Sequence, residues 1–529
     1  FYKTRGYLHS SGYAELQASQ STSLLSENTA TYAKRFGKNN ISAVAGFTFQ
    51  NFVNTNVGGS GTGFLSDVFE EYKLQTASTP GIPSSGYSKS VLMSYLARVN
   101  YSFDDKYLIT ASIRRDGSSR YSENNKWGSF PSAAVAWRAS NEDFLKGNKF
   151  ISNLKVRASW GLTGSQAIDP YVTLSTLENK NTIFGDALYN SFAPGSRLPG
   201  DLKWETTEQI NIGVDLGLWD RLNLTADYYV KNTRDLLNSV LLPTSSGYVN
   251  TIQNIGKVQN KGFELTLDAR VLTGEFKWNV NANISFNRNK VKKLYGGEDI
   301  FGGKVNAVIV NDETNILREG YPIGQFWGYL EDGYDEKGQI IFKDIKEDGT
   351  INKEDKTFIG DPNPDFIYGL TSNMSFKNFE LNLFFQGSQG NDLFNASAIS
   401  NTMDYGYGLN MPKDVFYNHW TTENTNAKYP AISYNTKVRV SDRFIENGSY
   451  LRLKNIQLAY NVPVRKLQCN WIRHLQVYAS GQNLLTFTKY SWWDPEVNTY
   501  GGANSVSQGI DYSSYPSSKS FTFGIRVGF

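Results

Sequence analysis

The chain has 529 residues, of which 40% are hydrophobic, and it contains no run of eighteen apolar residues, which excludes a helical membrane protein. Its 53 basic and 50 acidic residues leave a net charge of only +3, so no nucleic-acid surface is indicated. The single cysteine excludes an intrachain disulfide and a thiolate-rich metal site.

Alternation of apolar and polar residues predicts about fifteen β-strands, because successive side chains of a strand point to opposite faces. In residues 276–286, apolar side chains such as Trp278 and Val280 alternate with a row of amides and hydroxyls, which suits a wet lumen better than a packed core. In chain order the predicted strands cover residues 26–36, 40–53, 88–103, 105–116, 128–139, 152–163, 204–218, 221–233, 258–271, 275–288, 364–376, 378–388, 449–462, 471–485 and 518–529.

The connections between these strands alternate between short and long along the chain. In an up-and-down antiparallel barrel every second connection lies on the same side, so one side carries tight turns and the other long loops. A soluble sandwich has no reason to sort its loops in this way. We therefore predict an all-β fold, an antiparallel transmembrane β-barrel with long extracellular loops. The long connections are 54–87, 117–127, 164–203, 234–257, 289–363, 389–448 and 486–517.

The last strand, FTFGIRVGF, is apolar on one face and polar on the other, and it ends on an aromatic residue. Outer-membrane barrels end in this way. A high aromatic content of 14% also fits a protein with aromatic girdles at the two membrane interfaces. The apolar face consists of Phe521, Phe523, Ile525, Val527 and Phe529.

Several short motifs occur in a fixed order along roughly residues 90–529. They are RRDGSSRY (114–121), LKWE (202–205), NIGKVQNKGFE (254–264), GYPIGQFWGY (320–329), GDPNPDF (360–366), QGSQGND (386–392), SYLRLKNIQLAY (449–460) and DPEV (494–497), followed by the closing strand. With these motifs the chain resembles the SusC/RagA-type TonB-dependent transporters of the outer membrane of Gram-negative bacteria.

That resemblance implies a 22-stranded barrel, an N-terminal plug inside it and a motif that contacts TonB. It also implies a SusD-type surface lipoprotein as a lid, oligosaccharides or peptides as cargo, and no required cofactor. This sequence contains neither plug nor TonB-contacting motif and about seven strands fewer than such a barrel. We therefore expect residues 1–529 to be the C-terminal part of a barrel whose remaining wall and plug lie in an N-terminal portion.

In such a barrel the outward residues face outer-membrane lipid. The resemblance also implies that the apolar face of residues 521–529 is the assembly signal recognised by the barrel-insertion machinery. We expect this strand to pair with a first strand that the sequence does not contain, because an unpaired edge is not tolerated in lipid.

An acidic segment matches the ligand positions of a calcium loop in part. Asp344, Asp348, Asn352 and Asp355 occupy positions 1, 5, 9 and 12, and a glycine stands at position 6. Lys346, however, places a cation at position 3. Two interpretations stay open: a degenerate Ca²⁺ site, and an acidic loop closed by its own hydrogen bonds.

Aromatic residues of the last long connection are candidates for cargo contact. Trp492 and Trp493, with Tyr490 nearby, could present ring faces to the C–H surfaces of sugars. The alternative interpretation is a loop that folds on its own aromatic residues or on the lid.

No enzymatic chemistry is indicated, because none of the three histidines has the spacing of a zinc site or a catalytic triad. Two other functions stay open beside the transporter. A TonB-dependent siderophore or cobalamin receptor would share the barrel but not the motifs. A soluble secreted β-protein that binds glycans would be stable without detergent.

Overall fold

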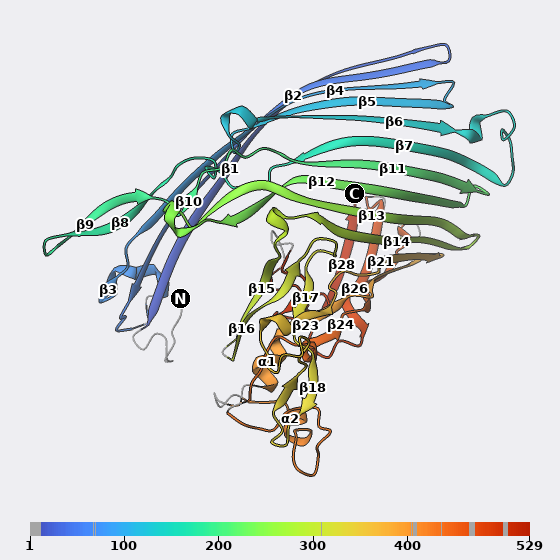
Figure 1. Cartoon of the computed structure of the whole chain (residues 1–529). Coiled ribbons are helices and arrows are strands. Elements are labelled where there is room, and N and C mark those ends of the chain that lie inside the picture. The colour runs from blue at the N-terminus through green and yellow to red at the C-terminus, as the bar shows by residue number, and fades with distance from the viewer. Residues whose placement is uncertain are drawn as a thin grey trace. The chain divides into compact units, whose positions relative to one another are not determined.

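The computed structural model describes residues 12–66, 68, 70–307, 309–403, 405, 410–434, 436–464, 471–500 and 506–529 (Figure 1). Within these ranges, no helix combines the length and the apolar character needed to cross a membrane. The chain divides into two compact units, and each is described by itself. Unit 1 comprises 1–135, 160–208 and 233–255, and unit 2 comprises 136–159, 209–232 and 256–529.

The largest sheet has seventeen strands. Two of them, β3 (Thr79–Pro80) and β10 (Arg197–Leu198), have only two residues each, which leaves fifteen long strands. These fifteen correspond one to one with the predicted strands, so the predicted all-β fold is confirmed. They are β1 (Tyr13–Phe36), β2 (Asn39–Thr62), β4 (Ser84–Phe103), β5 (Tyr107–Ser118), β6 (Trp127–Arg138), β7 (Ile151–Ser165), β11 (Glu205–Leu218), β12 (Leu222–Leu241), β13 (Asn250–Thr273), β14 (Phe276–Lys293), β21 (Phe366–Phe376), β22 (Phe379–Gln389), β25 (Tyr450–Asn461), β26 (His474–Thr488) and β28 (Ser520–Gly528).

Four strands extend well beyond their predicted ends. β1 starts at Tyr13, β2 continues to Thr62, β12 continues to Leu241 and β13 starts at Asn250, so the connections predicted at 54–87 and 234–257 are shorter than expected. In the β1–β2 extension, polar and small residues pair, such as Ser19 with Asn56. The backbone hydrogen bonds of a strand ladder do not require apolar side chains. Alternation of apolar and polar residues therefore detects only the part of a strand that has one apolar face.

Two motifs of the sequence build the small core of unit 1. Tyr121, the last residue of RRDGSSRY, is buried against Trp204 of LKWE, with 5.0 Å between the ring centroids. The Tyr121 hydroxyl donates a hydrogen bond to the carbonyl of Ser165 at 2.8 Å. Phe130 contacts the same tryptophan edge-on. Neighbouring strands of this unit pair in the antiparallel order β1–β2–β4–β5.

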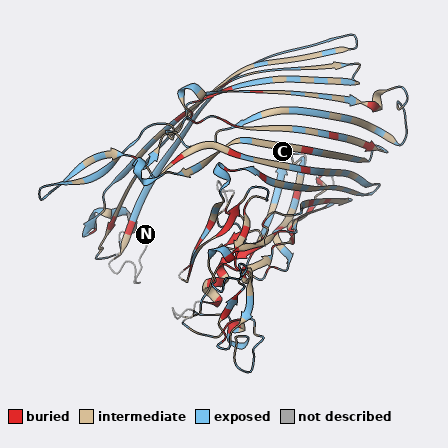
Figure 2. Ribbon diagram, in the orientation of Figure 1, coloured by how far each residue is buried: buried red, intermediate tan, exposed pale blue. Residues whose placement is uncertain are grey.

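In unit 2 the strands pair antiparallel in the order β13–β14–β21–β22–β25–β26–β28. The turn between β21 and β22 is tight and starts at Lys377, whose φ of 52° is left-handed. The predicted short connection at 463–470 lies mostly outside the described residues, which omit 465–470. Along these strands most residues are exposed or half-buried (Figure 2), as expected of a sheet whose two faces meet lipid and lumen.

The buried residues of unit 2 gather instead in its long connections (Figure 2). Connections 294–365, 390–449 and 489–519 fold together, and we call them the loop module. Their shared core includes Phe326 from the first connection, Phe394 and Phe444 from the second and Ile510 from the third. The loop module is thus a packed body rather than three separate loops.

Short elements give the loop module its order (Figure 1). They are β15 (Ile300–Ala307), β16 (Val310–Leu317), β17 (Gln325–Gly328), β18 (Glu331–Tyr334), β19 (Ile340–Phe342), β20 (Thr357–Gly360), β23 (Asp392–Asn395), α1 (Ala396–Thr402), α2 (Lys413–Tyr417), β24 (Ile445–Asn447) and β27 (Ile510–Asp511). Strands β23, β24 and β27 form a sheet that joins the second connection to the third.

Candidate functional site

A buried ion-pair network fixes the third connection of the loop module to the N-terminal end of β25. Arg452 and Asp494, both almost fully buried, lie 2.5 Å apart between Nη2 and Oδ1. The same guanidinium contacts Glu496 at 2.5 Å, and Lys454 contacts Glu496 at 2.6 Å. A buried charge pair is tolerated only when its remaining hydrogen bonds are satisfied, and here the Arg452 Nε donates to Thr486 at 2.9 Å.

The ionisation of Asp494 depends on this network. Burial raises the pKa of the carboxyl group, but hydrogen bonds from Arg452, from the Ser517 hydroxyl and from the backbone N–H of Glu496 lower it to about 2. Asp494 is therefore ionised at neutral pH. The network joins two motifs, SYLRLKNIQLAY and DPEV, whose pairing could not be read from the sequence because 42 residues separate the partners.

The three aromatic candidates of the sequence occupy different environments. Tyr490 is only 5% exposed, and its hydroxyl donates to Asp511 at 2.7 Å. Burial raises its pKa well above the ordinary value, with the neighbouring Asp511 as a further cause. Tyr490 thus packs inside the loop module and does not present a surface to cargo here. Trp493 is 69% exposed, and its ring meets that of Trp492 edge-on at 6.0 Å.

Trp492 lines a cavity of about 160 Å³ within the loop module. The cavity lies between α1 and the start of the third connection, and it combines charged, polar and apolar side chains. Its lining residues are Asn395, Ala398, Thr402, Met403, Lys428, Tyr429, Arg443, Phe444, Glu446, Ser491 and Trp492. Most of these residues could not be predicted as site residues, because they come from separate segments with no shared motif.

The two cations of this cavity are paired with carboxylates outside it, and its carboxylate is bonded within the lining. Arg443 lies 2.5 Å from Glu331, and Lys428 lies 2.7 Å from Asp414. The remaining carboxylate, Glu446, accepts hydrogen bonds from Asn395 and from the backbone and hydroxyl of Ser491. Each cation is therefore neutralised, and the carboxylate is fixed in position.

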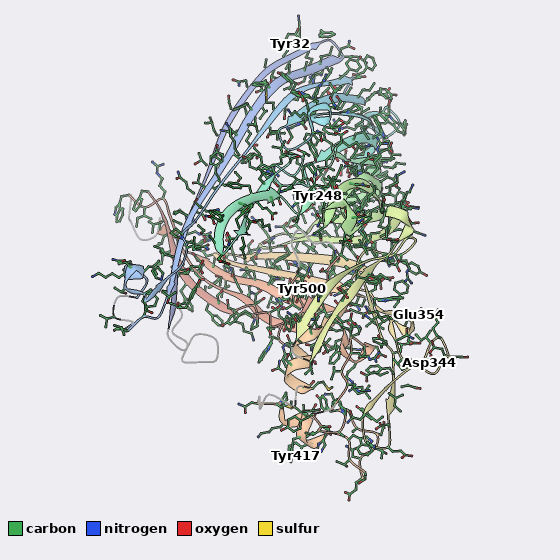
Figure 3. The ribbon with its side chains drawn as sticks, turned by 60° about the vertical axis from the view of Figure 1, so that its left-hand side comes forward. Tyr32, Tyr248, Asp344, Glu354, Tyr417 and Tyr500 are labelled. Atoms are coloured by element: carbon green, nitrogen blue, oxygen red, sulfur yellow. The ribbon has the colours of Figure 1, made fainter. Side chains whose placement is uncertain are left out.

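The acidic segment lies at the surface of the loop module, where Asp344 and Glu354 are seen in Figure 3. Asp355 accepts backbone N–H groups of Asn352, Ile345 and Lys346, and these hydrogen bonds lower its pKa although desolvation opposes them. Asp344 accepts the N–H of Gly349 at 2.7 Å. The carboxylates thus close the loop on its own backbone, as the second interpretation expects.

In the part of the chain that the structure describes, no group of three or more metal-ligating side chains converges. Asp348 bonds the N–H of Thr350 and Asn352 bonds that of Glu354, so each predicted ligand already serves the backbone. The residues as placed do not form a calcium ligand set. The Ca²⁺ site stays a prediction for these residues.

The closing strand β28 pairs with β26 and exposes its apolar row. Phe523 is 81% exposed, and the other four apolar residues are also exposed. The ring of Phe529 stacks nearly parallel on that of Trp471, at 5.7 Å between centroids and 9° between planes. Such a row suits contact with lipid, and its role as an assembly signal stays a prediction.

Comparison with known proteins shows that this chain is similar to TonB-dependent receptors. Residues 2–484 match a family profile described as TonB dependent receptor-like, beta-barrel. A TonB-dependent receptor of Formosa agariphila is 37% identical over 98% of this chain and 53% of its own length. The TonB-dependent receptor SusC of Bacteroides thetaiotaomicron is 33% identical over 94% of this chain and 49% of its own length.

A solved structure supports the same relationship. A chain of the RagAB peptide transporter superposes with a TM-score of 0.83 at 26% identity, over 98% of this chain and 56% of that one. The present chain therefore spans about half the length of the curated relatives that it matches.

Proposed function

The chain belongs to the TonB-dependent receptor family as an outer-membrane β-barrel protein of the SusC/RagA type, and from this premise we propose that it serves nutrient import. It would supply barrel wall and surface loops to a transporter of oligosaccharides or peptides. A SusD-type lipoprotein would cover the cargo, and TonB would supply the energy through the N-terminal portion.

The observation that carries this proposal is the loop module. A pore wall needs only tight turns and mobile loops, whereas here three long connections share one hydrophobic core. A packed body of this kind can hold a cargo or a lid in a defined orientation. The alternation of such connections with short turns supports an extracellular position for the module.

Unit 1 offers an additional surface for the lid. The connection between β7 and β11 carries a two-stranded hairpin, β8 (Leu177–Phe184) and β9 (Ala187–Pro194). Six large apolar side chains of this hairpin are exposed, and such patches mark protein contact sites. These side chains are Leu177, Ile183, Phe184, Leu188, Tyr189 and Phe192.

If the hairpin contacts the lid, its apolar side chains should be needed for association with the SusD-type lipoprotein. Replacing Phe184, Leu188 and Phe192 by serine should reduce recovery of the SusD-type lipoprotein with the transporter by about tenfold or more, because apolar anchors dominate interface energy. Serine replacements of Asn179, Asn181 and Asn190 on the same hairpin are the matched control. Equal recovery with both triple variants would remove the hairpin from the lid interface.

Growth of a deletion strain tests the transport class. We expect loss of growth on particular glycans or peptides, and normal growth when iron is limiting. A defect confined to iron limitation would instead support the siderophore receptor, and partition of the protein into the soluble fraction would support the secreted glycan-binding protein.

A further inference from the structure

The cavity beside Trp492 has the chemistry of a carbohydrate subsite. We propose that it takes a single ring of a neutral, polyhydroxylated cargo, such as one residue of an uncharged oligosaccharide. This inference rests on the import function proposed above and assigns the part of the loop module that recognises the cargo.

The size of the cavity limits what can enter. Whole ligands usually occupy about 300–1,000 Å³, so a space of about 160 Å³ accommodates a single ring or side chain rather than a complete ligand. The remaining cargo would extend into solvent past the exposed Trp493.

The charges of the cavity argue against an anionic ligand. Arg443 and Lys428 are already paired with Glu331 and Asp414, which leaves Glu446 as the one unbalanced charge among these five groups. A negatively charged ligand would be repelled by this carboxylate. A neutral ligand does not meet this penalty.

The hydrogen-bonding groups fit hydroxyls instead. Oε1 of Glu446 accepts from Asn395 and from the Ser491 hydroxyl, each at 2.8 Å, while Oε2 accepts one bond at 2.7 Å from the Ser491 N–H. A carboxylate has about four acceptor positions, so one position on Oε2 remains. The Lys428 ammonium retains N–H groups beyond the one given to Asp414. A hydroxyl can donate to Glu446 and accept from Lys428.

One aromatic residue completes the subsite. The Trp492 ring supplies an apolar wall suited to the C–H face of a sugar ring.

Binding by the complete transporter in detergent tests the proposal. The probes are maltohexaose, cellohexaose and laminarihexaose, with hexaalanine as the peptide comparison, and calorimetry gives Kd. We expect at least one hexasaccharide to bind, and Trp492→Ala to raise its Kd about tenfold, the loss expected for one aromatic contact. Trp471→Ala, which removes an exposed tryptophan outside the loop module, should change Kd less than about twofold.

A second variant separates blocking from unfolding. Ala398→Leu keeps a good helix former in α1 and fills the cavity, so it should also weaken hexasaccharide binding about tenfold or more. Three results would overturn the proposal: no hexasaccharide binds, hexaalanine binds in a manner that depends on Trp492, or Trp471→Ala weakens binding as much as Trp492→Ala. Binding is measured without TonB or a membrane gradient, so failure of energised import would leave this result unaffected.

Discussion

At the scale of single residues, the buried Arg452–Asp494 pair anchors the third connection to β25. Removing one partner of a buried pair leaves an uncompensated charge, at a cost of about 3–5 kcal/mol. Asp494→Asn should therefore release connection 489–519 and increase its cleavage by added protease. Asp344→Asn, in the surface loop, is the control and should leave the cleavage rate unchanged; equal cleavage of both variants would refute the anchoring role.

The same carboxylate predicts a response to acid. The pKa of Asp494 is lowered from 3.8 to about 2, so folding favours its ionised form. That contribution is complete above about pH 4 and disappears as the pH falls towards 2. Protease protection of connection 489–519, assayed after return from each pH and compared with Asp494→Asn, should decline over this interval. A decline centred near neutral pH would contradict the assignment.

At the scale of elements, the predicted assembly signal and the stacking of Phe529 on Trp471 can be tested separately. Deleting Phe529 should reduce the amount of protein in the outer membrane, because the predicted signal loses its terminal aromatic residue. Trp471→Ala removes the stacking partner of Phe529 and keeps the terminal aromatic residue, so the amount of protein in the outer membrane should stay normal. The free energy of unfolding should fall by about 1 kcal/mol. Normal membrane levels without Phe529 would count against the signal.

The elements also show what a sequence of this kind reveals. All fifteen long strands were predictable because lipid and lumen impose alternation on residues such as Trp278 and Val280. The extensions of β1, β2, β12 and β13 carry no such alternation, and three of them fall in the connections predicted at 54–87 and 234–257. The loop module was also missed, since a core built from Phe326, Phe394 and Ile510 depends on contacts between distant segments.

Candidate site residues, too, were predictable only where a local sequence pattern marks them. Trp492 was identifiable from its aromatic neighbours, and the structure places it in a cavity wall. Tyr490 carried the same signal but is buried against Asp511, because residue type does not reveal burial within a connection. Glu446 and Lys428 have no motif, and only the folded module brings them beside Trp492.

At the scale of the whole molecule, the chain combines a barrel wall with a structured body built from its long connections. If the proposed function is right, the loop module and the β8–β9 hairpin would offer surfaces for cargo and lid, and TonB would supply the energy. On this account, recognition can be altered by changing Trp492 while the wall stays intact. Import, in contrast, needs the complete transporter.

Energised uptake through the transporter that contains this chain tests the proposed import function most directly. Cells are given fluorescent maltohexaose, cellohexaose, laminarihexaose or hexaalanine, and accumulation is compared among wild type, a gene deletion, a strain lacking TonB and protonophore-treated cells. We expect at least one of these compounds to accumulate in wild-type cells. The same compound should not accumulate in the deletion strain, in the strain lacking TonB or in protonophore-treated cells. Accumulation that is unchanged without the gene, or that persists without TonB, would contradict the proposed import function.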